Sequence, residues 1–296
     1  MRPTVSVIIP VYNDPRGILE TLGSLPLDRP DCEVVVVDNG STDYTPTVVA
    51  ECVADVETVS LFVEDRIQSS YAARNKGIEH ARGDIFAFID ANMTVPADWI
   101  DRAVAEFRQS GADYMGCNVE LVLPDDPSIA ARYDDHTGFP VEQYLEYQRF
   151  VPTCCLVVHR EIIEAVGLFN HRLISGGDKE FGNRVHDAGY ETHFAASVTM
   201  YHPARNTLSA LVRKDRRVGR GLCQLQRYHP DRYGQLGLPP RPSGIKSPDH
   251  SVSTGYHVVF GVLSMFLTGI RGLGYYEECL TGEGSEHDDG FRRLKT

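Results

Sequence analysis

The chain has 296 residues, of which 42% are hydrophobic and 24% are charged, and its formal net charge is −12. This length allows one large α/β domain or two small ones, and the hydrophobic content is that of a globular protein with a full core. The acidic balance excludes a general nucleic-acid binder, because a phosphate-binding surface needs an excess of basic residues. Lysine is rare among the 29 basic residues. An acidic, lysine-poor surface is typical of proteins kept soluble in concentrated salt, with GC-rich codon bias as the alternative.

The first ninety residues alternate between apolar runs and helical patterns, as a parallel sheet requires. Apolar runs predict strands buried on both faces at 5–11, 32–38, 56–64 and 85–90. Helical spacing or a turn leading into a helix occupies 12–25, 39–53 and 70–82. We therefore predict an α/β fold with a doubly wound, mostly parallel sheet flanked by helices.

The pattern becomes less regular after residue 97. It predicts a helix over 97–111, a strand over 114–122, a strand leading into a helix over 153–169, a glycine turn opening a helix over 175–190, and a late strand over 191–203. Internal repeats and long linkers are absent from the sequence. We expect a catalytic domain over 1–205 and a C-terminal helical appendage over 206–296.

Seven cysteines are scattered through apolar stretches without zinc-site spacing. Their odd number, together with the lack of a secretory signal, predicts reduced thiols and a cytoplasmic location.

Polar side chains follow three of the predicted strands at corresponding ends. They are Tyr12, Asn13 and Asp14 after the first strand, Asp38 and Asn39 after the second, and Asp90 and Asn92 after the fourth. Ligands of doubly wound sheets bind beyond the carboxyl ends of the strands. A carboxylate at the end of an apolar strand is also costly unless a cation or a ligand meets it. We therefore expect Asp90 to face a ligand or a neighbouring arginine.

Five motifs in this order resemble family 2 glycosyltransferases, which are inverting, GT-A-fold enzymes that use nucleotide-sugars. They are VSVIIPVYN (5–13), VVVVDNGSTD (34–43), AARNKGIEHARGDIFAFIDAN (72–92), GGDKEFGNRV (176–185) and YHPAR (201–205). The resemblance implies a hexosyltransferase-type enzyme that moves a sugar from a nucleotide-sugar, UDP-linked by expectation, to an acceptor hydroxyl.

The resemblance also implies which residues hold the donor. Pro10, Tyr12 and Asn13 would contact the base and ribose, Asp38 would accept a hydrogen bond from the base, and Arg74, Asn75 and Asp90 would lie near the nucleotide. A carboxylate can read the imide N–H of uracil. The alternative for Asp38 is a helix N-cap. The alternative for Arg74 is an exposed helical cation, but the residue at i+4 is Ile78, which cannot pair with it.

A divalent metal, Mn²⁺ or Mg²⁺, is implied by the family's Asp-x-Asp motif. Here the motif reads Asp90-Ala91-Asn92, and asparagine offers a neutral oxygen that binds a hard cation more weakly than a carboxylate does. His202 is the third ligand candidate or a diphosphate contact, and a structural histidine is the alternative.

Asp178 matches the acid that serves the family as catalytic base. It sits in the glycine turn SGGDKEFG, where glycines suit a backbone that approaches a substrate. A single displacement needs one base and one stabiliser of the leaving group. The alternative for Asp178 is a helix N-cap, and Glu180 is the second candidate for the base.

Two C-terminal segments suggest partners. The segment 204–221 concentrates basic residues in an acidic chain, which favours a phosphate-bearing acceptor or an anionic membrane surface over a solvated helix face. The segment 255–276 is the most apolar, but its core between His257 and Arg271 is shorter than the ~20 residues of a spanning helix. An interfacial or partner-binding helix is expected there, with burial against the catalytic domain as the alternative.

Three functions remain open. The first is extension of a lipid-linked saccharide at the cytosolic membrane face, in glycan assembly. The second is transfer to an extracellular polysaccharide or a soluble acceptor. The third, suggested by Asn92, is a non-catalytic nucleotide-sugar-binding protein.

Overall fold

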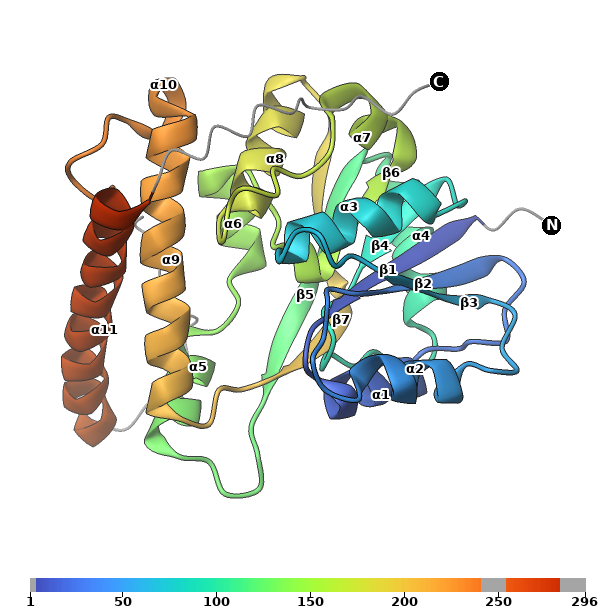
Figure 1. Ribbon diagram of the computed structural model, residues 1–296, viewed down its shortest axis with the longest axis horizontal. Helices are drawn as coiled ribbons and strands as arrows, with labels where there is room; N and C mark the ends of the chain where they lie inside the picture. Colours follow the sequence, from blue (N-terminus) through green and yellow to red (C-terminus); the bar gives the residue numbers. More distant parts are fainter. Residues whose placement is uncertain (1–3, 241–253, 283–296) are drawn as a thin grey trace.

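The computed structural model describes residues 4–240 and 254–282, and its seven strands form one mixed sheet in the order β3-β2-β1-β4-β6-β5-β7 (Figure 1). The strands are β1 (Val5–Val11), β2 (Cys32–Asp38), β3 (Val59–Val63), β4 (Ile85–Phe88), β5 (Tyr114–Val122), β6 (Leu156–His159) and β7 (Thr192–Pro203). β1, β2, β3 and β4 are mutually parallel, as are β5 and β7, whereas β6 is antiparallel to both β4 and β5. The predicted mostly parallel α/β sheet is confirmed.

Helices flank this sheet and extend beyond it. They are α1 (Pro15–Ser24), α2 (Thr45–Cys52), α3 (Ser70–His80), α4 (Trp99–Ser110), α5 (Ile129–Thr137), α6 (Val141–Gln148), a 3₁₀ helix (Thr153–Cys155), α7 (Arg160–Val166), α8 (Gly177–Asp187), α9 (Leu208–Tyr228), α10 (Pro230–Tyr233) and α11 (Thr254–Thr281). The two short helices α5 and α6 lie in and after the acidic stretch 124–140, where periodicity predicts no element.

The strongest sequence signals produce the expected elements. Every residue of β1 and of β2 is buried, as continuous β-branched runs predict. Asp14 caps α1 through a hydrogen bond from the backbone N–H of Gly17 to its Oδ1, and Pro15 occupies the first turn. Gly111, with φ of 67°, ends α4 in the left-handed conformation that favours glycine.

The register brings the polar strand ends together. Val11 of β1 lies opposite Asp38 of β2, and Ile8 of β1 lies opposite Phe88 at the end of β4. Because these strands are parallel, the residues that follow them emerge at one edge of the sheet. This edge is where the sequence places the donor site.

The C-terminal part is a pair of parallel helices, α9 and α11, that stand side by side next to the sheet (Figure 1). Their backbones approach closely at Gly219 and Gly274. A Cβ atom at Gly219 would lie 1.9 Å from the carbonyl oxygen of Arg271, and one at Gly274 would lie 2.2 Å from that of Arg216. The expected helical appendage is confirmed. Its proposed boundary at 205 stays a prediction, and residues 241–253 and 283–296 of the predicted 206–296 unit lie outside the described residues.

Candidate functional site

A cavity of about 590 Å³ opens at the edge of the sheet where β1 and β4 end. Six of the residues predicted from sequence line it, namely Pro10, Tyr12, Arg74, Asp90, Asp178 and His202. They come from the ends of β1 and β4, from α3, from the first turn of α8 and from β7. Residues as far apart in the sequence as Pro10 and His202, which are 192 positions apart, therefore meet at one site.

Asp90 is paired with a buried arginine. Nη2 of Arg74 donates a hydrogen bond to Oδ1 of Asp90, and the Arg74 side chain is 5% exposed against 39% for Asp90. The carboxylate at the end of the β4 segment is thus compensated from α3 and still reaches the cavity. Arg74 therefore pairs with a residue outside its own helix and is not an exposed helical cation.

Asp178 lies at the start of α8, where Gly176 adopts a left-handed conformation with φ of 83°. Its Oδ1 accepts a hydrogen bond from the backbone N–H of Lys179 at 2.9 Å. Burial raises the pKa of the Asp178 carboxyl above its usual value, and Arg74 and Arg217 oppose that rise. A partly desolvated carboxylate of raised pKa that faces a cavity is suited to accept a proton.

Tyr71 is a cavity residue that the sequence reasoning missed. Its hydroxyl accepts hydrogen bonds from the backbone N–H groups of Gly177 at 3.0 Å and Asp178 at 3.3 Å. The hydroxyl also lies 3.5 Å from Oδ1 of Asp178, to which it donates. Tyr71 stands three residues before Arg74 on the same face of α3, and that i,i+3 spacing is the signal that could have identified it.

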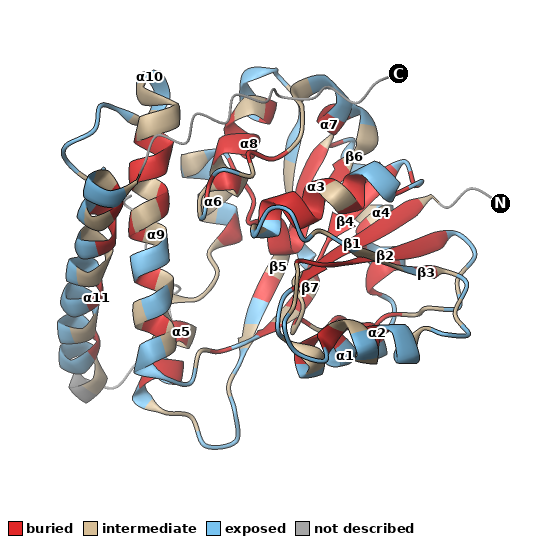
Figure 2. Cartoon of the chain, in the orientation of Figure 1, coloured by how far each residue is buried: buried red, intermediate tan, exposed pale blue. Residues whose placement is uncertain are grey.

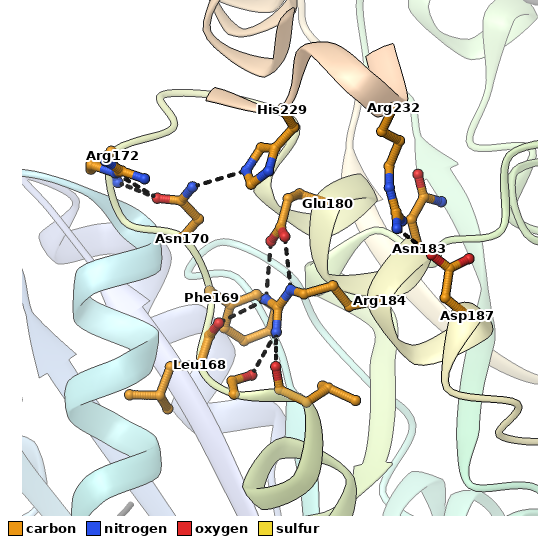
Figure 3. A network of polar contacts seen from close by, with 12 residues as sticks. Leu168, Phe169, Asn170, Arg172, Glu180, Asn183, Arg184, Asp187, His229 and Arg232 are labelled. Atoms are coloured by element: carbon orange, nitrogen blue, oxygen red, sulfur yellow. Dashed lines mark hydrogen bonds and ion pairs between the residues drawn. The ribbon is translucent and has the colours of Figure 1, made fainter. Parts of the chain in front are cut away.

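Glu180 is engaged elsewhere. It forms an ion pair with Arg184, with 2.7 Å between Oε1 and Nε, and it is absent from the cavity wall (Figure 3). The same guanidinium donates to carbonyl oxygens of 166–168. Figure 3 shows this network joining α8 to the loop that carries Asn170 and Arg172. The network holds the loop beside the cavity and leaves Asp178 as the carboxylate of α8 that faces the site.

Three predicted donor-binding residues lie outside the cavity wall. Asn13 bonds with Thr42, and thereby ties the loop after β1 to the loop after β2. The amide of Asn75 donates to the carbonyl of Phe169 and accepts from its backbone N–H. Asp38 accepts from the backbone N–H of Ser41 at 2.9 Å, while its Oδ1 is buried without a hydrogen-bond partner among the described residues. Their contacts with a donor stay predictions.

The metal candidates differ in how well they fit a cation. Asp90 and His202 both line the cavity, and Nδ1 of His202 lies 2.8 Å from the carbonyl oxygen of Pro203. Burial lowers the pKa of His202, so the imidazole is neutral and its Nε2 lone pair is available to a metal. Asn92 has a buried Oδ1 without a partner among the described residues, but it does not line the cavity.

In the described ranges, no group of three His, Cys, Asp or Glu side chains gathers as a metal site. A divalent cation held by Asp90 and His202 would take its remaining ligands from a donor diphosphate and water, as Mg²⁺ sites commonly do.

Most cations of the predicted basic segment are neutralised within the chain. Arg205 and Lys214 pair with buried Asp134, at 3.1 and 3.3 Å. Arg216 and Arg220 pair with Glu277 and Glu278 of α11. Arg217 makes no hydrogen bond or ion pair within the part of the chain that the structure describes, and it lines the cavity with Arg172 and Arg205.

The charged residues Arg271, Glu277 and Glu278 of α11 form ion pairs with α9, and Glu278 is buried. Arg271 pairs with Asp215, and both glutamates pair with arginines of α9. The face of α11 turned away from α9 is exposed (Figure 2), and apolar side chains cover it. That face consists of Val258, Val259, Val262, Met265, Phe266, Leu273, Tyr276 and Leu280. The described helix continues to Thr281, and Tyr256–Thr281 is long and apolar enough to cross a membrane by length and composition. The expectation that this segment is too short to span is therefore wrong.

Comparison with known proteins identifies the family of the chain. The family model described as glycosyl transferase family 2 matches residues 6–167. Glycosyltransferase AglE of Haloferax volcanii is 39% identical over 226 residues, which cover 75% of this chain and 74% of the relative. The undecaprenyl-phosphate 4-deoxy-4-formamido-L-arabinose transferase of Pseudomonas fluorescens is 34% identical over 125 residues, covering 39% of this chain and 36% of that protein.

Among solved structures, mannosyltransferase PcManGT from Pyrobaculum calidifontis, in complex with GDP-Man and Mn²⁺, superposes with a TM-score of 0.59 at 22% identity. That match covers 95% of this chain and 74% of the mannosyltransferase. At this identity the likeness concerns the fold, and it confirms the expected GT-A architecture.

Proposed function

Because the chain belongs to glycosyl transferase family 2 and is a glycosyltransferase, we propose that it inverts the anomeric centre of a nucleotide-sugar while transferring the sugar to a lipid-linked saccharide. The observation that carries this proposal is the meeting of Asp178 with the Asp90–Arg74 pair in one cavity. In this proposal Asp178 is the base, and the Asp90–Arg74 pair supplies charge beside the bound nucleotide-sugar. A UDP-linked donor is proposed first, because the Oδ1 of Asp38 is free of partners among the described residues and can accept the uracil imide N–H.

The proposed reaction is one displacement. Asp178 takes the proton of the acceptor hydroxyl, the oxygen forms a bond to the anomeric carbon, and the bond from that carbon to the nucleoside diphosphate breaks on the opposite face. The departing diphosphate gains negative charge, and Arg74 and the other cavity arginines stabilise that charge electrostatically. A divalent cation bound at Asp90 and His202 would add Lewis-acid stabilisation of that leaving group.

A lipid-linked acceptor is supported by the C-terminal helices. The apolar face of α11 defined above is solvent-exposed, and the charged residues Arg271 and Glu277 of this helix pair with α9. A large exposed apolar patch marks an interaction surface, and a face without charged side chains suits contact with hydrocarbon. Arg217, at the cavity wall and without a partner among the residues that the structure describes, suits the phosphate of a lipid carrier. The name of the Pseudomonas fluorescens relative specifies an undecaprenyl-phosphate substrate, which is consistent with this class.

The donor is tested by thermal shift with a panel of UDP-sugars and GDP-sugars, with and without Mn²⁺ or Mg²⁺. A ligand at 100 times its Kd stabilises the folded state by about 2.7 kcal/mol, so a cognate donor raises the melting temperature measurably. Stabilisation by UDP-sugars is expected. Stabilisation by GDP-sugars alone would replace the proposed donor class, and binding without turnover would favour the non-catalytic alternative.

The acceptor is tested with a polyprenyl-diphosphate-linked saccharide and a phosphate-free alkyl glycoside of the same sugar. The lipid-linked compound should be used with the higher kcat/KM. Vesicles of anionic phospholipid should cosediment with the protein, and Met265→Glu on the face of α11 should release it. Val122→Glu is the matched control, because Val122 is 49% exposed outside α11. Equal use of both acceptors together with no vesicle binding would favour a soluble or polysaccharide acceptor.

A further inference from the structure

The first turn of α8 has an unusual cap. Its N-cap residue, Gly176, has no side chain and therefore makes no capping hydrogen bond. The hydroxyl of Tyr71, on α3, instead accepts from the backbone N–H groups of Gly177 and Asp178. A side-chain oxygen from another helix thus does what Ser, Thr, Asp or Asn usually does from the N-cap position itself.

The ring of Tyr71 is fixed in place around this contact. A Cβ atom on Gly177 would lie 2.7 Å from Cε2 and Cζ of the ring, so only glycine permits the approach. Phe169 stacks on the ring with 6.0 Å between centroids, and the Arg74 guanidinium lies 5.6 Å from its centre. Tyr71 is buried, so its hydroxyl has little freedom to point elsewhere.

The hydroxyl also reaches the carboxylate that follows this cap. Among the described residues, Tyr71 is the only side chain that hydrogen-bonds Asp178, at 3.5 Å from Oδ1, and the other donor to that oxygen is the backbone N–H of Lys179. We infer that Tyr71 is a positioning residue for sugar transfer, which holds the Asp178 carboxylate in its ionised form and aimed at the acceptor hydroxyl. This inference rests on the proposed role of Asp178 as the base.

Several charged or titratable groups surround Asp178, and the charges of Arg74 and Arg217 act on its ionisation. The surrounding groups are Arg74 and Tyr71 on α3, Lys179 on α8, Arg217 on α9, Tyr144 on α6 and Tyr114 on β5. A test must therefore separate the hydroxyl of Tyr71 from the field of these neighbours. Tyr71→Phe does so, because it removes one oxygen and leaves every charge in place.

The matched control is Tyr114→Phe. The Tyr114 hydroxyl is also buried and also accepts a backbone N–H, that of Val151 at 2.9 Å, but it does not bond Asp178. Both variants lose a buried hydroxyl that satisfies backbone, so both should lose stability. Only Tyr71→Phe should change the chemistry at Asp178.

The first measurement is independent of activity. In protein labelled with ¹³C at aspartate carboxyl carbons, the resonance absent from Asp178→Asn identifies Asp178. Its titration should move to higher pH in Tyr71→Phe, because the carboxylate has lost a donor that favours its charged form. It should stay in place in Tyr114→Phe. An unmoved titration in Tyr71→Phe would overturn the inference.

The second measurement is release of UDP from the UDP-sugar that stabilises the protein best. Tyr71→Phe should lower kcat roughly 10- to 100-fold, the effect of one hydrogen bond to a charged group, with donor affinity unchanged and the acidic limb of the kcat profile at higher pH. Gly177→Ala, which displaces the ring, should reproduce the effect should Tyr71→Phe fold poorly. Full kcat in both variants would refute the positioning role. Full turnover in Asp178→Asn would instead refute the proposed base, while the carboxyl titration would still decide whether Tyr71 controls Asp178.

Discussion

Asp178→Asn should make the protein inactive and, at neutral pH, more stable. Burial raises the pKa of this carboxyl in the folded state, so the ionised form is less favourable there than in the unfolded chain. The stability linked to this group is present below the unfolded pKa and is lost as the pH rises through the folded pKa. Asparagine carries no charge and keeps the Oδ1 acceptor for the backbone N–H of Lys179. The gain in melting temperature should therefore be seen at pH 7 and disappear in acid.

The loss of activity follows from the same carboxylate. Removing a general base costs about 10² to 10⁴ in rate, which corresponds to about 3 to 5 kcal/mol of barrier at 1.36 kcal/mol per tenfold. Donor affinity should hold, because the base acts on the acceptor. The assays are nucleoside diphosphate release, donor binding by calorimetry, and melting temperature at pH 7 and in acid.

Glu180→Gln on the same helix is the control, because it should lower stability and leave turnover unchanged. Glu180 is buried and paired with Arg184, so this change removes the negative charge of a buried ion pair and should destabilise the fold. Turnover per folded molecule should persist, because Glu180 lies outside the cavity wall. Near wild-type turnover in Asp178→Asn, or loss of stability at pH 7, would refute the reasoning about Asp178.

Three further predictions address the donor, the metal and the C-terminal helices. Asp38→Ala should weaken donor binding by about 1 to 3 kcal/mol through the base N–H left unpaired, and an unchanged Kd by calorimetry would leave Asp38 with its turn bond to Ser41 alone. Asn92→Asp should tighten Mn²⁺ binding, because hard cations prefer carboxylates, and no gain in calorimetric affinity would remove Asn92 from the metal ligands. Gly219→Ala should destabilise the α9–α11 pair by about 1 to 3 kcal/mol, because its Cβ would meet a carbonyl oxygen at 1.9 Å. In contrast, Gly272→Ala, where a Cβ has no neighbour within 4 Å, should be neutral or stabilising in thermal denaturation.

The fold was predictable where local pattern and burial agree. Strands at 5–11, 32–38 and 114–122 have the same bounds in the structure as in the sequence analysis. In the first two every residue is buried, and runs buried on both faces leave little ambiguity. The sequence pattern did not indicate that β6 is antiparallel to its neighbours, because the direction of pairing depends on the chain connections and not on composition. The helices α5 and α6 were missed because polar, acidic segments give weak periodicity.

The candidate site was predictable through motifs and less so through contacts. The acid at the end of a strand, Asp90, does pair with a cation, but that this cation is Arg74 depends on how α3 lies against β1 and β2. The role of Tyr71 depends on the approach of α3 to the start of α8, 107 residues away in sequence. The neutralisation of the basic segment was equally invisible, because Asp134, Glu277 and Glu278 are distant in the chain from the arginines they pair with.

Arg217 is the α9 cation proposed to bind the phosphate of the acceptor, and its position permits a direct test of the acceptor class. It lines the cavity without a partner among the described residues, and it is close enough to Asp178 to influence that carboxyl. A phosphate group bound beside the base would place the acceptor hydroxyl within reach of Asp178. Arg217→Gln should therefore weaken binding of a phosphate-bearing acceptor by about 1.5 kcal/mol, the lower end for a hydrogen bond to a charged group because Arg217 is exposed. This loss raises the KM for the acceptor about tenfold and leaves the KM for the donor unchanged.

Arg213→Gln is the matched control, because Arg213 is an exposed arginine of the same helix that does not line the cavity. With a phosphate-free alkyl glycoside the two variants should behave alike. An equal tenfold loss with both acceptors would place Arg217 on the donor diphosphate, and no loss with either would exclude it from the site.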